Sequence, residues 1–183
     1  ILATGKMTKQ IESLQAHTKE YTATLQLGAT TPSYDMEHEV NATFPTEHIT
    51  RELIENAVLQ FVGDIQQVPP TYSAVKVNGE RAFNYRRAGE EVVLKPKNIH
   101  IEEIEVTNFD EEKMQLSLRV VCGKGTYIRA LARDLGRALS SGAYLTELRR
   151  TQVGDITIEN CIDYDHFQEW LNKQTLEKGD TNR

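Results

Sequence analysis

The expected fold depends on one segment, Val121-Cys122-Gly123-Lys124-Gly125-Thr126-Tyr127-Ile128-Arg129, because one element ends in it and another begins. An apolar run ends near Val121, two glycines free the backbone, and helical spacing starts at about Thr126. Such a junction directs backbone N–H groups and the first helical side chains into a cleft. Arg129 falls in the first helical turn, where a cation opposes the helix dipole. We therefore expect a carboxylate or a phosphate beside it, and a guanidinium exposed to solvent is the alternative.

The elements around this junction follow from apolar spacing. A helix over Thr126–Leu139 is predicted by one apolar face, made of Ile128, Leu131, Leu135 and Leu139. Paired strands joined by the polar turn Asp110–Lys113 are predicted at Ile99–Val106 and Met114–Val121. After the helix we predict strands at Tyr144–Arg149 and Asp155–Ile158, and then a helix that Asp163 caps and that runs through Phe167 and Trp170.

The first half of the chain adds a helix at Lys6–His17, a strand at Tyr21–Leu27 and a helix that Thr50 caps and that ends before Gly63. The stretch Gln67–Gly79 differs, because Pro69-Pro70 cannot continue a helix. A short strand at Tyr72–Val77, a tight turn at Asn78-Gly79 and a helix at Arg81–Ala88 ended by Gly89 follow.

Together these elements predict one α+β domain over residues 1–175. Its centre would be a mixed, mostly antiparallel sheet with flanking helices. Residues from about 63 to 97 would form an inserted lobe outside that sheet, and residues 176–183 a flexible tail.

Composition is that of an ordinary globular domain: 183 residues, 39% hydrophobic and 26% charged. No apolar run is long enough to span a membrane, and we expect a cytoplasmic protein. Cys122 and Cys161 do not form a CxxC pair, and both are predicted to be buried, unreactive thiols. None of the five histidines has the spacing of a metal-binding motif, so no metal is predicted.

The net charge of −6 argues weakly against a nucleic-acid partner. The charges are unevenly placed, however, because basic residues gather in the second half of the chain: Lys124, Arg129, Arg133, Arg137, Arg149 and Arg150. We expect either one basic face on an acidic body or, as the alternative, ordinary solvated helix faces.

Four blocks of sequence carry a resemblance to a known family. The junction block reads CGKGTYIRALARDLG at Cys122–Gly136, followed by AYLTELRR at Ala143–Arg150. The other blocks are GKMTK at Gly5–Lys9, KEY at Lys19–Tyr21 with Leu27-Gly28, Thr31 and Asp35, and QVPPTYSAVKVNG at Gln67–Gly79. In this content and order, the chain resembles the TruB family of tRNA pseudouridine synthases as far as about Ile158. It departs from the family at His38, where a glycine is common, so we expect a different turn there.

The resemblance implies a pseudouridine synthase fold with an inserted lobe that grips RNA. It implies that a uridine in the T-loop of tRNA, at position 55, is isomerised without a cofactor, the tRNA T-arm being the partner of a monomer. The family nucleophile is the Asp of a G-x-L-D-P-x-A-T-G loop, expected upstream of Ile1, so the chain as given is expected to be inactive. The alternatives are a noncatalytic tRNA- or RNA-binding module and, without a supporting motif, a small-molecule-binding domain.

Two residues receive catalytic roles from the resemblance. Arg129 would pair with the nucleophilic Asp, and Tyr21 would pack against the flipped base and could help to remove the C5 proton. Spacing alone favours the alternative that Tyr21 is a core or rim aromatic on a strand. RNA-binding roles are implied for six others: Lys19, Tyr72, Lys76, Lys124, Tyr127 and Leu148. For Lys76 a solvated lysine, for Tyr72 packing beside Pro70, and for Leu148 core packing remain as alternatives.

Overall fold

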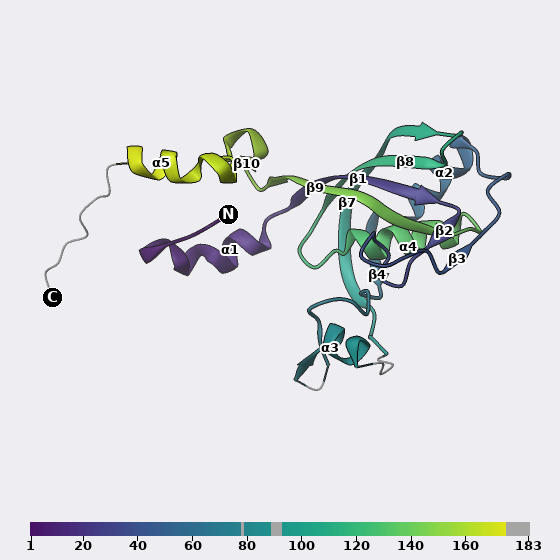
Figure 1. Cartoon of the computed structure of the whole chain (residues 1–183), viewed down its shortest axis with the longest axis horizontal. Helices are drawn as coiled ribbons and strands as arrows, with labels where there is room; N and C mark the ends of the chain where they lie inside the picture. Colours follow the sequence, from purple (N-terminus) through teal and green to yellow (C-terminus); the bar gives the residue numbers. More distant parts are fainter. Residues whose placement is uncertain (78, 89–92, 175–183) are drawn as a thin grey trace, which may run out of the picture.

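The computed structural model describes residues 1–77, 79–88 and 93–174, without the side chains of Arg86 and Arg87. A six-stranded sheet forms its centre, in the order β10-β9-β1-β8-β7-β4 (Figure 1). Every pairing in this sheet is antiparallel. Its strands are β1 (Lys19–Leu27), β4 (Gly63–Gln67), β7 (Lys97–Asp110), β8 (Gln115–Cys122), β9 (Ala143–Val153) and β10 (Ile156–Thr157). The expected α+β class is confirmed.

Alternation along β8 shows why these residues form a half-buried strand. Leu116, Leu118, Val120 and Cys122 are buried, and the residues between them face the other way. On that other face Arg119 donates to Glu20 at 2.7 Å and to Glu103 at 2.9 Å, across the neighbouring strands β1 and β7. One face of the sheet is therefore apolar core, and the opposite face carries ion pairs.

Two helices pack on the apolar face. The longer, α4 (Ile128–Ala138), lies close against β9, and a Cβ at Gly136 would come within 2.5 Å of the backbone nitrogen of Ala143. The other, α2 (Arg51–Val58), continues into a 3-10 turn at Leu59–Phe61. The Thr50 hydroxyl accepts from the N–H of Leu53 at 3.2 Å, which confirms the predicted cap.

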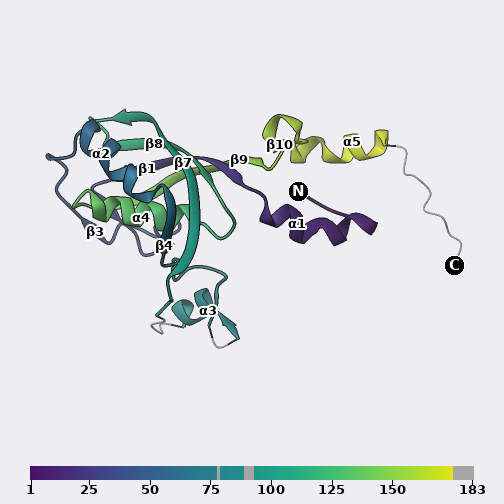
Figure 2. The same ribbon diagram turned by 180° about the vertical axis from the view of Figure 1, so that it is seen from behind.

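Both ends of the described chain project from one end of the sheet (Figures 1 and 2). The N-terminal arm is a 3-10 helix, Gly5–Gln10, followed by α1 (Ile11–Ala16). The C-terminal arm has 3-10 turns at Ile158–Asn160 and Tyr164–His166 and ends in α5 (Phe167–Lys173). Asp163 was predicted to cap the last helix, but it caps the second of these turns, and α5 begins after that turn at Phe167.

The lobe projects below the sheet (Figure 2). It contains a two-stranded ribbon, β5 (Lys76–Val77) with β6 (Glu80–Arg81), and the helix α3 (Ala82–Arg87). The prediction that the lobe starts at about residue 63 is wrong. Residues Gly63–Gln67 form β4, which pairs with β7 from Gly63↔Ile101 to Gln67↔Lys97 and is an edge strand of the central sheet. The predicted Asn78 turn position, the helix end at Gly89 and the tail 176–183 lie outside the described residues.

A second small sheet pairs β2 (Ala29–Thr30) with β3 (Ala42–Thr43). Of the two cysteines, Cys122 is buried as predicted, but Cys161 is exposed. That prediction was wrong because Cys161 follows a 3-10 turn of the C-terminal arm, away from the core. In the described ranges, no helix combines the length and apolarity that crossing a membrane requires.

Candidate active site

Arg129 meets a carboxylate from a distant part of the chain. Its Nη1 lies 2.9 Å from Oδ2 of Asp35, and its Nη2 donates to the backbone oxygen of Tyr72 at 2.7 Å. The expectation of a carboxylate beside this first-turn cation is therefore confirmed. The carboxylate is that of Asp35, whereas the family resemblance pairs Arg129 with the nucleophilic Asp. These bonds occupy only part of the guanidinium's donor set.

The loop Thr31–Asp35 holds the carboxylate in place. Oδ1 of Asp35 accepts from the Ser33 hydroxyl at 2.6 Å and from the N–H of Glu37 at 3.0 Å, and the Thr31 hydroxyl donates to its backbone oxygen at 2.7 Å. Partial burial opposes ionisation of Asp35. The hydrogen bonds from Ser33 and Glu37 and the charge of Arg129 outweigh it, so its pKa lies below the ordinary 3.8. The site thus contains an ionised, oriented ion pair.

His38 contacts both this turn and Tyr72. Its Nδ1 lies 3.0 Å from the Ser33 hydroxyl oxygen. Its ring centroid lies 4.6 Å from that of Tyr72, with the rings tilted by 50°. Tyr72 therefore contacts the site twice, through its backbone oxygen on Arg129 and through its ring on His38. The base of the lobe is thereby fixed to the ion pair.

A pocket of about 200 Å³ opens beside the pair, lined by Asp35, Met36, Arg129 and the β9 residues Leu145 to Leu148. Leu148 is 48% exposed, so it lines this pocket and is not a core residue. Leu148 is the register partner of Ala23 on β1, and Tyr21 on the same strand is that of Arg150. Side chains two apart on a strand share a face. Tyr21 and Leu148 therefore lie on the face that carries α4, and Tyr21 packs at the edge of the core.

The remaining residues that were predicted to bind RNA lie further from the Arg129–Asp35 ion pair. The Lys19 ammonium donates to the backbone oxygens of Gln15 and His17, the latter at 2.6 Å, so it ties the end of α1 to β1. Lys124 is exposed in the turn before α4, and Lys76 is exposed on the lobe. Tyr127 precedes α4, and its backbone N–H donates to Oε1 of Gln67 at 2.9 Å.

The expected basic face is smaller than the sequence suggests. Arg129 is paired with Asp35 and Arg133 with Asp134, whereas Arg137, Arg149 and Arg150 are exposed. Within the described part of the chain, no group of three or more His, Cys, Asp or Glu side chains could hold a metal ion.

Three residues of the site were not among those predicted. Asp35 stood in a recognised block but received no role, and the buried side chains of Ser33 and Gln67 orient the carboxylate and the turn before α4. A polar residue that must be buried carries no local pattern of its own. The signal that could have found Asp35 is the uncompensated cation at the start of a helix.

Comparison with known proteins places this geometry in a class. The chain resembles a solved structure described as "Crystal Structure of a Cbf5-Nop10-Gar1 Complex", with a TM-score of 0.60 and 26% identity over 94% of this chain and 43% of that one. Residues 1–128 match the family model described as TruB family pseudouridylate synthase (N terminal domain). Residues 129–180 match the tRNA pseudouridylate synthase B C-terminal domain. The fold and the matching family models place the chain in the pseudouridine synthase class.

Curated relatives narrow this class to one family. The chain is 58% identical to tRNA pseudouridine synthase B of Bacteroides thetaiotaomicron, over all of this chain and 77% of that protein. It is 59% identical to the protein of the same name from Bacteroides fragilis, over 98% of this chain and 76% of that protein. The chain belongs to the TruB family.

Proposed function

We propose that this chain provides the catalytic domain of a tRNA pseudouridine synthase, which isomerises the uridine at position 55 in the T-loop of tRNA. One observation carries the proposal: in a TruB family chain, the Arg129–Asp35 ion pair opens onto a pocket beside Leu148. The target base has to leave its stack to reach such a pocket, because its reacting atoms are inaccessible inside a folded loop.

Arg129 would orient the nucleophile. The resemblance assigns that role to an Asp in a loop preceding Ile1. The Arg129 N–H groups not used by Asp35, Ser33 and Tyr72 are available to a second carboxylate. A carboxylate held there stays ionised, and a covalent adduct with it divides one difficult step into two easier ones. The uracil is detached from the ribose, rotated and rejoined through carbon.

Tyr21 and Leu148 would hold the base. Both lie on the same face of the sheet, on the adjacent strands β1 and β9. The Tyr21 ring would pack against the uracil, and its hydroxyl would take part in removal of the C5 proton. Leu148 would line the uracil pocket, which agrees with its exposure beside Arg129.

RNA would be gripped by residues outside this pocket: Lys19, Tyr72, Lys76, Lys124 and Tyr127. Burial lowers the pKa of Lys19, and the charges of Arg150 and Lys124 act in the same direction, so these three cations form one positive region. The T-arm of tRNA would cross this region and meet the lobe. The monomeric state stays a prediction, which light scattering of the purified protein would check.

The alternative of a noncatalytic RNA-binding module is not favoured, because the relatives that match the whole chain are named as synthases. A direct test compares the chain with a version extended at its N-terminus by a G-x-L-D-P-x-A-T-G loop. The extended protein should convert uridine in a T-arm RNA in single-turnover assays, and its Asp→Asn variant should not.

The Tyr21→Phe change in the extended protein tests the hydroxyl separately. We expect the single-turnover rate to fall about a hundredfold or more, while RNA affinity stays within about threefold, because the ring remains. Tyr144→Phe, on β9, is the matched control and should leave the rate unchanged. A Tyr21→Phe protein that reacts at the parental rate would show that Tyr21 is a packing residue.

A further inference from the structure

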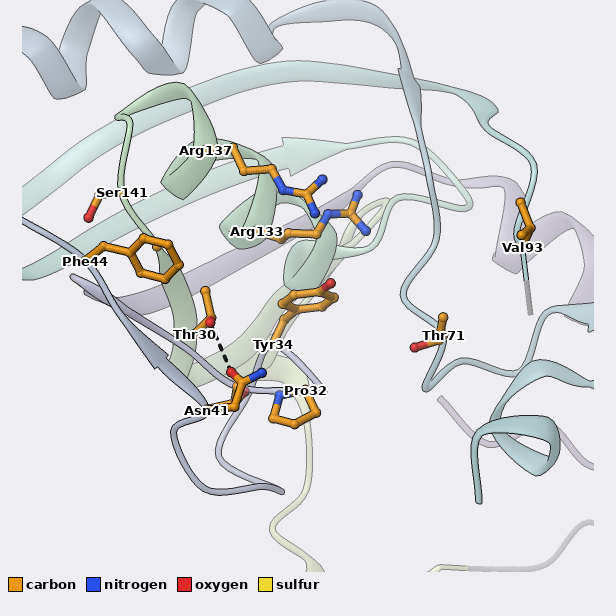
Figure 3. A pocket seen from close by; sticks show the side chains of 12 residues that line it. Thr30, Pro32, Tyr34, Asn41, Phe44, Thr71, Val93, Arg133, Arg137 and Ser141 are labelled. Atoms are coloured by element: carbon orange, nitrogen blue, oxygen red, sulfur yellow. Dashed lines mark hydrogen bonds between the residues drawn. The ribbon is translucent and has the colours of Figure 1, made fainter. Parts of the chain in front are cut away.

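A second and larger pocket, of about 530 Å³, shares the Thr31–Asp35 loop with the Arg129 site (Figure 3). Tyr34 lines this pocket, whereas the next residue, Asp35, lines the other. Tyr34 has a φ of 62°, a left-handed conformation that bulky residues seldom adopt. Backbone strain of this kind is retained only where surrounding contacts hold it. Two consecutive side chains of this loop, Tyr34 and Asp35, therefore line two different pockets.

The charge at one end of this pocket is positive. Arg133 and Arg137 project into it from successive turns of α4 (Figure 3). Arg133 is only 7% exposed, and Asp134 and the backbone oxygen of Val68 hold its guanidinium 5.4 Å from the centre of the Tyr34 ring. Arg137 is 69% exposed, and its Nη1 lies 3.9 Å from Asp134.

The guanidinium groups of Arg133 and Arg137 share one carboxylate, that of Asp134, so the three side chains together carry a net positive charge. Among the described residues that line the pocket, none is acidic. An anion that entered would meet a buried, fixed cation on Arg133 and an exposed one on Arg137. The pocket is therefore suited to a phosphate group, but it is too large for phosphate alone to fill.

The rest of the pocket offers an aromatic ring and an amide. Phe44 is 39% exposed, and its ring lies so close to Gly142 that a Cβ there would approach it to 2.6 Å. The Thr30 hydroxyl donates to Oδ1 of Asn41 at 3.0 Å. The Asn41 amide nitrogen points away from that bond, towards Tyr34 and Pro32 (Figure 3). An aromatic face with a nearby amide donor is a common means of holding a nucleobase.

We infer that this pocket binds a nucleoside monophosphate, with its phosphate on Arg137 and Arg133 and its base against Phe44 and Asn41. Its volume lies within the range of small-ligand sites, roughly 300–1,000 Å³. The ligand is either one unpaired nucleotide of an RNA chain or a free nucleotide. The inference goes beyond the proposed function, because no step of the isomerisation uses these side chains.

Amide NMR of the chain with 5′-CMP tests the inference. Saturable shifts are expected at the Asn41 side-chain amide and the Gly142 backbone amide. Arg137→Gln should weaken binding about tenfold through loss of a charge-assisted contact. Because Arg137 is exposed, this change leaves the fold intact. Arg51→Gln, an exposed arginine on α2 paired with Glu55, is the matched control and should bind as the parent does.

Inorganic phosphate and cytidine separate the two halves of the ligand, and each should bind more weakly than 5′-CMP. Phe44→Leu should remove the advantage of 5′-CMP over phosphate. The source is distinguished by adding a T-arm RNA to the 5′-CMP complex: displacement indicates an RNA nucleotide, and simultaneous binding indicates a free one. Absence of shifts, equal binding of phosphate or cytidine, or an unchanged Arg137→Gln affinity would overturn the inference. None of these outcomes depends on uridine conversion, which tests the proposed function separately.

Discussion

Arg129 reaches across the fold to Asp35, Ser33 and Tyr72, and these contacts give its guanidinium one position. In a protein that carries the nucleophilic loop, Arg129→Ala should lower the single-turnover rate about a hundredfold or more. RNA affinity should change less than about threefold, because it comes from many distributed phosphate contacts. Arg129→Lys should also lower this rate, because an ammonium group cannot reproduce the forked pair of hydrogen bonds that a guanidinium donates to a carboxylate.

Arg119 provides the matched control for this prediction. It is another partly buried arginine, bound to Glu20 and Glu103, but it lies on the opposite face of the sheet. Arg119→Ala should lower stability and leave the rate unchanged. If Arg129→Ala lost affinity in proportion to rate, Arg129 would be a phosphate contact rather than the residue that positions a carboxylate.

Asp35 makes the site sensitive to acid. Its pKa in the folded protein lies below the ordinary 3.8, so the stability it contributes is present above that value and is lost as pH falls through the lower, folded pKa. Ser33→Ala removes a hydrogen bond to the carboxylate and should raise that pKa, so the contribution of Asp35 becomes smaller and its loss is complete at a higher pH. The change should cost about 1–2 kcal/mol near neutral pH.

Urea unfolding between about pH 2 and about pH 7 measures both effects. Ser141→Ala is the control, because the buried Ser141 hydroxyl donates to the backbone oxygen of Pro45 and not to a carboxylate. It should lower stability by a similar amount at every pH. An identical pH dependence for Ser33→Ala and the parent would show that the Ser33 hydroxyl does not stabilise ionised Asp35.

Among the elements, the lobe ribbon β5–β6 makes its own prediction about RNA. Lys76 and Arg81 are register partners and both are exposed, so they place two positive charges side by side. Replacing both with Gln should weaken T-arm binding and lower the slope of log affinity against log salt by about one to two, because each phosphate contact releases counterions.

The control for the ribbon is the double change Arg51→Gln and Lys113→Gln, at two exposed cations on the body of the domain. It removes the same net charge and should leave the slope unchanged. Equal effects of the two double variants would mean that net charge alone matters and that the lobe does not grip RNA.

For the whole molecule, stability depends on the contact between α4 and the sheet. Leu131 is buried in the core cluster, and Leu131→Ala should cost about 2–5 kcal/mol of unfolding free energy. Leu59→Ala, at an exposed leucine after α2, should have little effect. Urea unfolding compares the two. A small loss of unfolding free energy in Leu131→Ala would show that α4 can shift to fill the cavity that the substitution leaves.

Much of this fold could be predicted because the signals are local. The alternation along β8 predicted a half-buried strand, the apolar face of Thr126–Leu139 predicted α4, and Thr50 predicted the start of α2. β4 was missed because its sequence, Gly-Asp-Ile-Gln-Gln, has one apolar residue and a buried glutamine. Its place in the sheet comes from pairing with β7, which alternation within five residues cannot indicate.

The sequence by itself determined the family, most strands and helices of the central domain, and the presence of a cation at the start of α4 beside which a carboxylate or a phosphate was expected. Only the tertiary structure decided that Asp35, 94 positions away, supplies it, and that Tyr34 and Asp35 face different pockets. The physical reason is one of range. Backbone propensity and apolar spacing act over a few residues. The meeting of Arg129 with Asp35 depends instead on how β1, β9 and α4 pack, and that is set by the core as a whole.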